Sequence, residues 1–139
     1  MKKIKITIFD KVSLIAELDD KKCPVVVDSF LKMLPINVDV HHGIWSGSEI
    51  WAELKNFSKY AHENETHLPG IGEIMIVQHS GKTFFDLWYG KGLACTDKGT
   101  VNGAIIGKAI ENLDNFAKEA AKICPAGGVN LSISLLDNY

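Results

Sequence analysis

The pattern of apolar and polar residues in the first quarter of the chain predicts a β-hairpin followed by a helix. Apolar and polar residues alternate over residues 3–18 on both sides of a polar Asp10–Lys11 turn, which is typical of two half-buried strands. Apolar residues at helical spacing then lie between Pro24, which suits a first helical turn, and Pro35, which ends the helix.

The middle of the chain predicts further strands around a long loop. Residues 38–42 alternate as a short strand, whereas residues 48–57 fit a helix face and a strand face equally well. Residues 61–72 are polar, with one proline and two glycines, and predict a long loop of the kind that often binds ligands. Residues 73–79 and 83–89 predict a second hairpin.

The last third predicts an irregular stretch, a helix and a final strand. Glycines punctuate residues 90–104, an apolar stripe at helical spacing predicts a helix over 107–123, and residues 129–135 alternate as a strand. Six or seven strands, two helices and no alternation of strand and helix favour an antiparallel barrel or sandwich with helices at its ends. We expect a single domain over residues 1–139.

Composition narrows the class of partner. The chain has 139 residues, 46% of them hydrophobic, and a net charge of −2, which disfavours a nucleic-acid partner. All 15 basic residues are lysines, so no mechanism can use a guanidinium. No apolar run approaches the length of a membrane span, and the alternating start predicts a strand instead of a signal peptide. We therefore expect a cytoplasmic protein with no membrane partner.

The three cysteines, Cys23, Cys95 and Cys124, are odd in number and have no CxxC spacing. This spacing argues against a disulfide or zinc framework and favours reduced thiols.

Three stretches, in this order, resemble a cyclophilin-type barrel. They are Cys23–Leu31, similar to the first-helix motif, Gly72–Ile74, which leads a strand, and Ile106–Phe116, similar to the turn into the second helix. The resemblance implies a mainly β protein, a closed eight-stranded barrel capped by two helices. It also favours a strand within residues 48–57.

A closer similarity is to a family of uncharacterised bacterial cyclophilin-like proteins, the domain-of-unknown-function family 3830. The residues that carry it are His42 with Trp45-Ser46-Gly47, Glu63 to Thr66, Pro69 to Glu73, and Tyr89-Gly90.

True cyclophilins are peptidyl-prolyl isomerases whose catalytic arginine ends the strand after the first helix. The corresponding segment here, residues 40–44, reads Val-His-His-Gly-Ile and holds no arginine. His41 or His42 would have to donate instead, with less electrostatic stabilisation than a guanidinium gives.

The cluster around these histidines is the candidate site. Neighbouring residues on a strand point to opposite faces, so only one of His41 and His42 can line a given pocket. We predict His42, His41 and Ser46 as catalytic residues, with an imidazole as acid or base. The alternative interpretation is one exposed histidine, one packed histidine and a turn serine. We predict ligand binding by Trp45, Tyr89, Asn102 and Glu65, since an aromatic side chain offers a flat wall.

Histidines and carboxylates at His62, Glu63, Glu65 and His67 are ligand types that divalent metals use. Their spacing is not the i, i+4 pair of a metalloprotease helix and fixes no geometry. We therefore expect no metal and no cofactor.

These observations predict a protein that binds a small molecule where the strand before Trp45, the 61–72 loop and the 95–103 loop converge. Any reaction would be hydrolysis or isomerisation of a small amide or cyclic compound. Two alternatives remain open: a noncanonical prolyl isomerase or peptide-binding module, and a non-catalytic subunit of a homo-oligomer.

Overall fold

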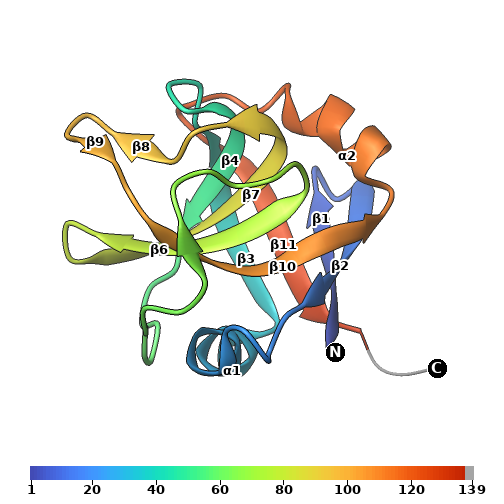
Figure 1. Cartoon of the computed structure of the whole chain (residues 1–139). Helices are drawn as coiled ribbons and strands as arrows, with labels where there is room; N and C mark the ends of the chain where they lie inside the picture. The colour runs from blue at the N-terminus through green and yellow to red at the C-terminus, as the bar shows by residue number, and fades with distance from the viewer. Residues whose placement is uncertain (137–139) are drawn as a thin grey trace.

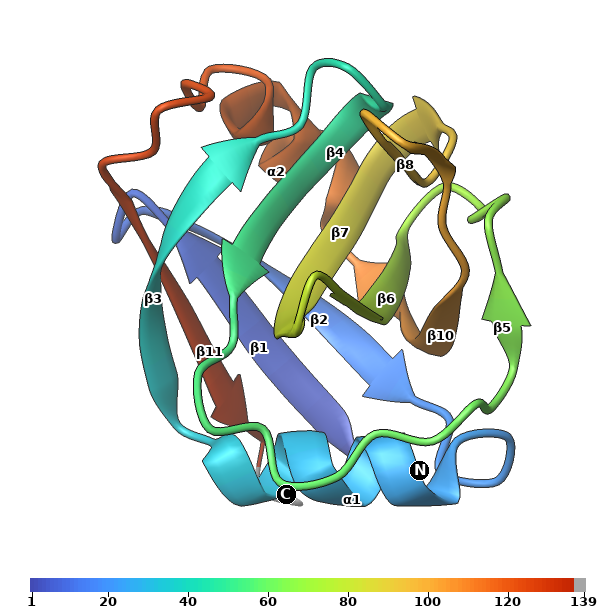
Figure 2. The same cartoon turned by 90° about the vertical axis from the view of Figure 1, so that its left-hand side faces the viewer.

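The strands form a closed antiparallel β-barrel of eight strands with two helices (Figures 1 and 2). The structure is a computed structural model, and it describes residues 1–136. The mainly β, cyclophilin-like barrel predicted from the sequence is confirmed.

The barrel closes because its first and last strands in sheet order pair with each other. The order is β2-β1-β11-β3-β4-β7-β6-β10, and β10 pairs back onto β2. A short β5 (Glu65–Thr66) adds to β10, while β8 (Cys95–Thr96) and β9 (Gly99–Thr100) form a separate hairpin. The barrel strands are β1 (Lys3–Ile8), β2 (Val12–Leu18), β3 (Ile36–His42), β4 (Gly47–Glu53), β6 (Glu73–His79), β7 (Lys82–Gly92), β10 (Gly103–Glu111) and β11 (Val129–Leu135).

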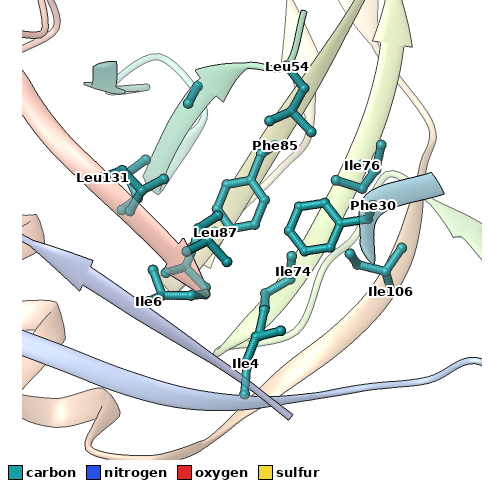
Figure 3. Close-up of a cluster of buried hydrophobic side chains, with 14 of the residues drawn as sticks. Ile4, Ile6, Phe30, Leu54, Ile74, Ile76, Phe85, Leu87, Ile106 and Leu131 are labelled. Atoms are coloured by element: carbon teal, nitrogen blue, oxygen red, sulfur yellow. The ribbon is translucent and has the colours of Figure 1, made fainter. Parts of the chain in front are cut away.

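Alternation along the strands fills the barrel with apolar side chains. Ile4 and Ile6 of β1 and Phe85 of β7 are fully buried and point into the interior (Figure 3). Phe30, from α1 (Pro24–Met33), reaches this core and stacks on Phe85 with ring centroids 5.8 Å apart. Helix α1 thus seals one end of the barrel, and α2 (Leu113–Ala120) lies toward the other (Figures 1 and 2).

The 61–72 loop holds α1 in place through a carboxylate. No side chain at Cys23 caps the helix, and its first backbone N–H groups would otherwise lack acceptors. Glu63 supplies the acceptors: its Oε1 lies 3.1 Å from Val25 N and 3.0 Å from Val26 N. The loop predicted over these residues is therefore structural in part, and it contains the two residues of β5.

The predicted helix over residues 107–123 is wrong in its first third. Residues 103–111 form β10, and α2 spans only Leu113–Ala120. Helical spacing misleads here because a β-bulge between Ala109 and Glu111 breaks the alternation of β10 and leaves Ile110 exposed. Pairing with β2 and β6 outweighs local propensity. Gly107 fits because a Cβ there would stand 2.5 Å from the Glu17 carbonyl oxygen.

The remaining predicted elements agree with the structure. The ambiguous residues 48–57 contain β4, as the family resemblance implied, and β7 extends beyond the predicted 83–89 to Gly92. The stretch 90–104, predicted as irregular, contains the β8–β9 hairpin in its middle. Neither helix within residues 1–136 is long and apolar enough to cross a membrane.

Candidate functional site

A pocket of about 510 Å³ lies on the outer face of the barrel wall formed by β4, β7 and β6. The β8–β9 hairpin, which stands off from the barrel in Figure 1, forms its opposite side. We call it the outer pocket; its lining residues are Trp45, Glu49, Trp51, Val77, His79, Phe84, Asp86, Ala94, Cys95, Thr96, Asp97 and Val101.

Two acidic residues line the outer pocket from neighbouring strands. Glu49 of β4 and Asp86 of β7 sit on the outward face, because Ile50 and Leu87 beside them point into the barrel. Their side chains are nevertheless only 5% and 6% exposed, and they hydrogen-bond to each other. We call Glu49 and Asp86 the carboxyl pair.

The turn before β4 supports the Glu49 carboxyl. The Ser46 hydroxyl is directed at Gly43 O, 2.9 Å away, and at Glu49 Oε1, 3.2 Å away. Gly43 has to be glycine for this arrangement, because a Cβ at residue 43 would collide with the Glu49 carboxyl. The sequence Gly-Ile-Trp-Ser therefore holds one member of the carboxyl pair against the wall.

Burial makes it costly for both members of the carboxyl pair to be charged at once. Burial, and then the negative charge of Asp86, raise the pKa of Glu49 far above the ordinary range of a glutamate. Burial also raises the pKa of Asp86, but the hydrogen bond from Glu49 stabilises its carboxylate, so its pKa rises less. Near neutral pH the pair therefore holds a proton, on Glu49, beside an Asp86 group that can gain or lose one.

Aromatic rings form the wall of the outer pocket around the carboxyl pair. Trp51 meets Trp45 edge-on at 6.4 Å and Phe84 edge-on at 5.6 Å, and His79 stacks on Phe84 at 4.6 Å. The buried Nε1–H of Trp51 finds no acceptor among residues 1–136. Such a surface suits a flat ligand that carries a hydrogen-bond acceptor.

Backbone and side-chain hydrogen bonds hold the β8–β9 hairpin over the pocket. Leu93 N donates to Ser46 O at 2.8 Å, and Ala94 N donates to His67 O at 3.0 Å. At the rim, the indole Nε1–H of Trp45 donates to Cys95 O at 3.1 Å. The same turn that supports Glu49 thus also anchors the hairpin.

Only part of the predicted site lies at the outer pocket. Trp45 lines it, and Ser46 contacts Glu49 from behind. His42 instead points to the inner side of the wall, where its Nε2 hydrogen-bonds the Tyr89 hydroxyl. Burial lowers the pKa of His42 and raises that of Tyr89, so both are neutral at pH 7.

The other predicted residues lie apart from this pair. His41 faces outward, stacks on Trp51 at 4.3 Å and has its Nδ1 3.1 Å from Pro125 O, behind the pocket wall. Glu65 accepts a 2.6 Å hydrogen bond from Tyr60, and Asn102 is exposed in the link from β9 to β10. The residues predicted to form one site therefore do not lie together.

The pattern analysis missed Glu49 and Asp86. One signal was available: Asp86 lies between Phe84 and Trp88 on the same strand face, an acidic group between two large aromatics. Glu49 gave no such signal, because residues 48–57 fit a helix face and a strand face equally well.

The fold and this site define a cyclophilin-like barrel with a carboxyl-lined pocket on its outer face. The chain belongs to the protein family of unknown function DUF3830, whose model matches residues 6–135. No curated protein matches the chain significantly.

Two solved structures share the barrel. McbB in complex with tryptophan superposes with a TM-score of 0.73 at 14% identity, over 94% of this chain and 44% of McbB. The chain thus spans less than half the length of McbB. The hypothetical protein AF2241 from Archaeoglobus fulgidus gives a TM-score of 0.60 at 16% identity, over 96% of this chain and 93% of that protein. At these identities the likeness is one of fold.

Proposed function

We propose that this protein binds a small, partly aromatic molecule in the outer pocket and transfers a proton on it with the carboxyl pair. The observation that carries the proposal is the burial of Glu49 and Asp86 together in a pocket large enough for a small ligand. A surface carboxylate costs a fold little, whereas two carboxyls held out of water destabilise it, a cost that is typical of functional sites.

The protonation states suit a proton shift. Neutral Glu49 donates to a carbonyl oxygen or ring nitrogen, and Asp86, whose pKa is raised but less so, accepts a proton from a neighbouring atom of the ligand. The net result is an isomerisation of a small amide or cyclic compound. The same two groups would serve hydrolysis, with a water in place of the ligand atom that loses the proton.

This proposal replaces histidine with a carboxyl as the acid–base group. His42 is turned to the inner side of the wall and His41 lies behind Trp51, so neither lines the outer pocket. Ser46 and Trp45 keep roles from the predicted site, as a positioning residue for Glu49 and as part of the aromatic rim.

A thermal-shift screen tests binding, because a ligand of the folded state raises Tm by mass action. The panel contains small aromatic amides, cyclic ureides, carboxylic acids, indole compounds such as the tryptophan bound to McbB, X-Pro peptides and divalent metals. We expect a rise with one small-molecule class. Thr96→Trp, which fills the pocket from the hairpin, should abolish it, and Lys98→Trp, on the exposed side of the same hairpin, should not. A shift that survives in Thr96→Trp would contradict the proposal, and a shift with X-Pro peptides alone would favour the isomerase.

A second candidate function, a subunit of a homo-oligomer, is favoured by apolar side chains exposed beside the pocket. Ile44, Leu68 and Leu93 are large and exposed, and their segments are joined by the Ser46–Leu93 and His67–Ala94 hydrogen bonds. Sedimentation of the purified protein decides this candidate: a monomer at all concentrations rejects it. A dimer that Ile44→Lys dissociates supports it.

A further inference from the structure

We infer that the outer pocket selects a small organic cation, an aromatic or cyclic amine, whose ammonium group lies beside Glu49 and Asp86. This inference rests on the proposed function, because it names the class of ligand for the same pocket. It follows from the charges and rings that line the pocket.

Three acidic side chains and no lysine line the pocket. Glu49 and Asp86 lie in its wall and Asp97 on the hairpin, whereas no lysine is among the lining residues. Since the sequence has no arginine, no fixed cation neutralises these groups. An anionic ligand would meet like charges in a site of low dielectric, and an amine would meet opposite ones.

The rings add to the same preference. Trp45, Trp51 and Phe84 offer aromatic surface around the carboxyl pair, and the face of such a ring attracts a cation. Aromatic surface beside carboxylates is the combination that recognises organic ammonium groups. The ring system of the ligand would contact the apolar part of the wall, Val77, Ala94 and Val101.

Binding of a cation would also change the protonation of the pocket. A positive charge beside the carboxyl pair favours the ionised form of Asp86, so protons that Asp86 retains near neutral pH are released, while Glu49 keeps its own. The titratable groups that face the pair across the pocket are His79 of β6 and Cys95 and Asp97 of the hairpin. Because the imidazole of His79 also lines the pocket, its substitution is needed as a control.

Three indole compounds of similar size and different charge test the inference: tryptamine, a cation; tryptophol, its neutral analogue; and indole-3-acetate, an anion. In titration calorimetry near neutral pH, the affinity for tryptamine should exceed that for tryptophol by about tenfold or more, and indole-3-acetate should bind most weakly. Heats measured in two buffers of different ionisation enthalpy should show proton release with tryptamine only. Three variants serve as controls. His79→Gln should keep most of the proton release. Asp86→Asn should lose both the proton release and the preference for the cation, whereas Glu53→Gln, on the same strand as Glu49, should change neither.

The outcomes separate the two proposals. Equal affinity for tryptamine and tryptophol, or tighter binding of indole-3-acetate, overturns the inference and leaves a pocket for small aromatic molecules. If none of the three compounds binds, cation selection by this pocket is rejected, and the thermal-shift panel alone then decides the proposed function. Circular dichroism of each variant checks that it folds.

Discussion

The inner and outer faces of the wall formed by β4, β7 and β6 belong to the same strands, but the inner face packs the core and the outer face lines the pocket. On the inner face Ile50, Leu87 and Ile74 pack into one apolar core. On the outer face Glu49 and Asp86 are as well buried, yet under a hairpin and next to a pocket. Alternation along a strand normally leaves one face exposed to water. Because carboxyls are buried on this outer face, we assign stability to the inner face and the candidate site to the outer face.

The largest expected effect is on the inner face. Phe85→Ala removes a fully buried ring that stacks on Phe30, and we expect the free energy of unfolding to fall by about 3–5 kcal/mol. Phe84→Ala, one residue away on the outer face, removes a partly exposed ring and should cost roughly 1 kcal/mol. Urea unfolding of both variants measures the difference. Equal losses would contradict the division of the wall into core and site.

The carboxyl pair gives the outer face a pH dependence opposite in sign to that of His42 on the inner side of the wall. The folded state keeps protons that the unfolded chain releases above about pH 4, so stability is full below that pH and falls as pH rises. Each proton retained lowers the free energy of unfolding by about 1.4 kcal/mol per pH unit.

Glu49→Gln keeps the shape of the protonated side chain and removes its titration. Unfolding measured from about pH 5 to about pH 9 should give a slope shallower by nearly one proton than in the unsubstituted protein. Glu53→Gln, further along β4 and with a half-exposed side chain, should leave the slope unchanged. Parallel slopes for all three proteins would mean that Glu49 is ionised in the folded state.

A smaller effect is expected where the 61–72 loop meets α1. Glu63→Ala leaves the Val25 and Val26 N–H groups without their acceptor and should cost about 1 kcal/mol. Glu63→Gln keeps an acceptor oxygen and should recover part of this loss, as thermal unfolding can show. Because Glu63 does not line the outer pocket, ligand binding by Glu63→Ala should match that of the unsubstituted protein when both are folded.

The smallest effect on stability is expected for a substitution at the rim of the outer pocket. Trp45→Phe removes the indole hydrogen bond to Cys95 O and reduces the edge contact with Trp51, and Trp45 is 57% exposed, so the free energy of unfolding should change by less than about 1 kcal/mol. Affinity for tryptamine should fall by more than the free energy of unfolding does, since the hairpin loses a tether and the pocket loses one of its two indole rings. An unchanged affinity would place the ligand away from Trp45.

The sequence predicts an element correctly where only one of its faces is buried, because the apolar residues then repeat with a clear period. The hairpin of residues 3–18, the helix after Pro24 and the strand 129–135 alternate or repeat cleanly, and each is found in place. It fails at β10, where a β-bulge between Ala109 and Glu111 and pairing to β2 and β6 hide the period of the strand. Local spacing there imitates a helix, and only the barrel shows why it is not one.

The candidate site was harder to predict than the fold. The His41-His42 pair drew attention because histidine titrates near neutral pH, but the two side chains lie on opposite sides of the wall. Glu49 and Asp86 are ordinary acids in the sequence and become unusual only when the hairpin of residues 93–101 covers them. That cover is a long-range contact, which no local pattern encodes.

The most direct test of the account is infrared spectroscopy of the carboxyl groups at neutral pH. The protonated carboxyl of Glu49 should give a C=O band separate from the ionised carboxylates, present in the unsubstituted protein and in Glu53→Gln, and absent in Glu49→Gln. Addition of tryptamine should change this band if the ligand lies beside the pair. A spectrum with every carboxyl ionised at neutral pH would contradict the shared proton on which the proposed function depends.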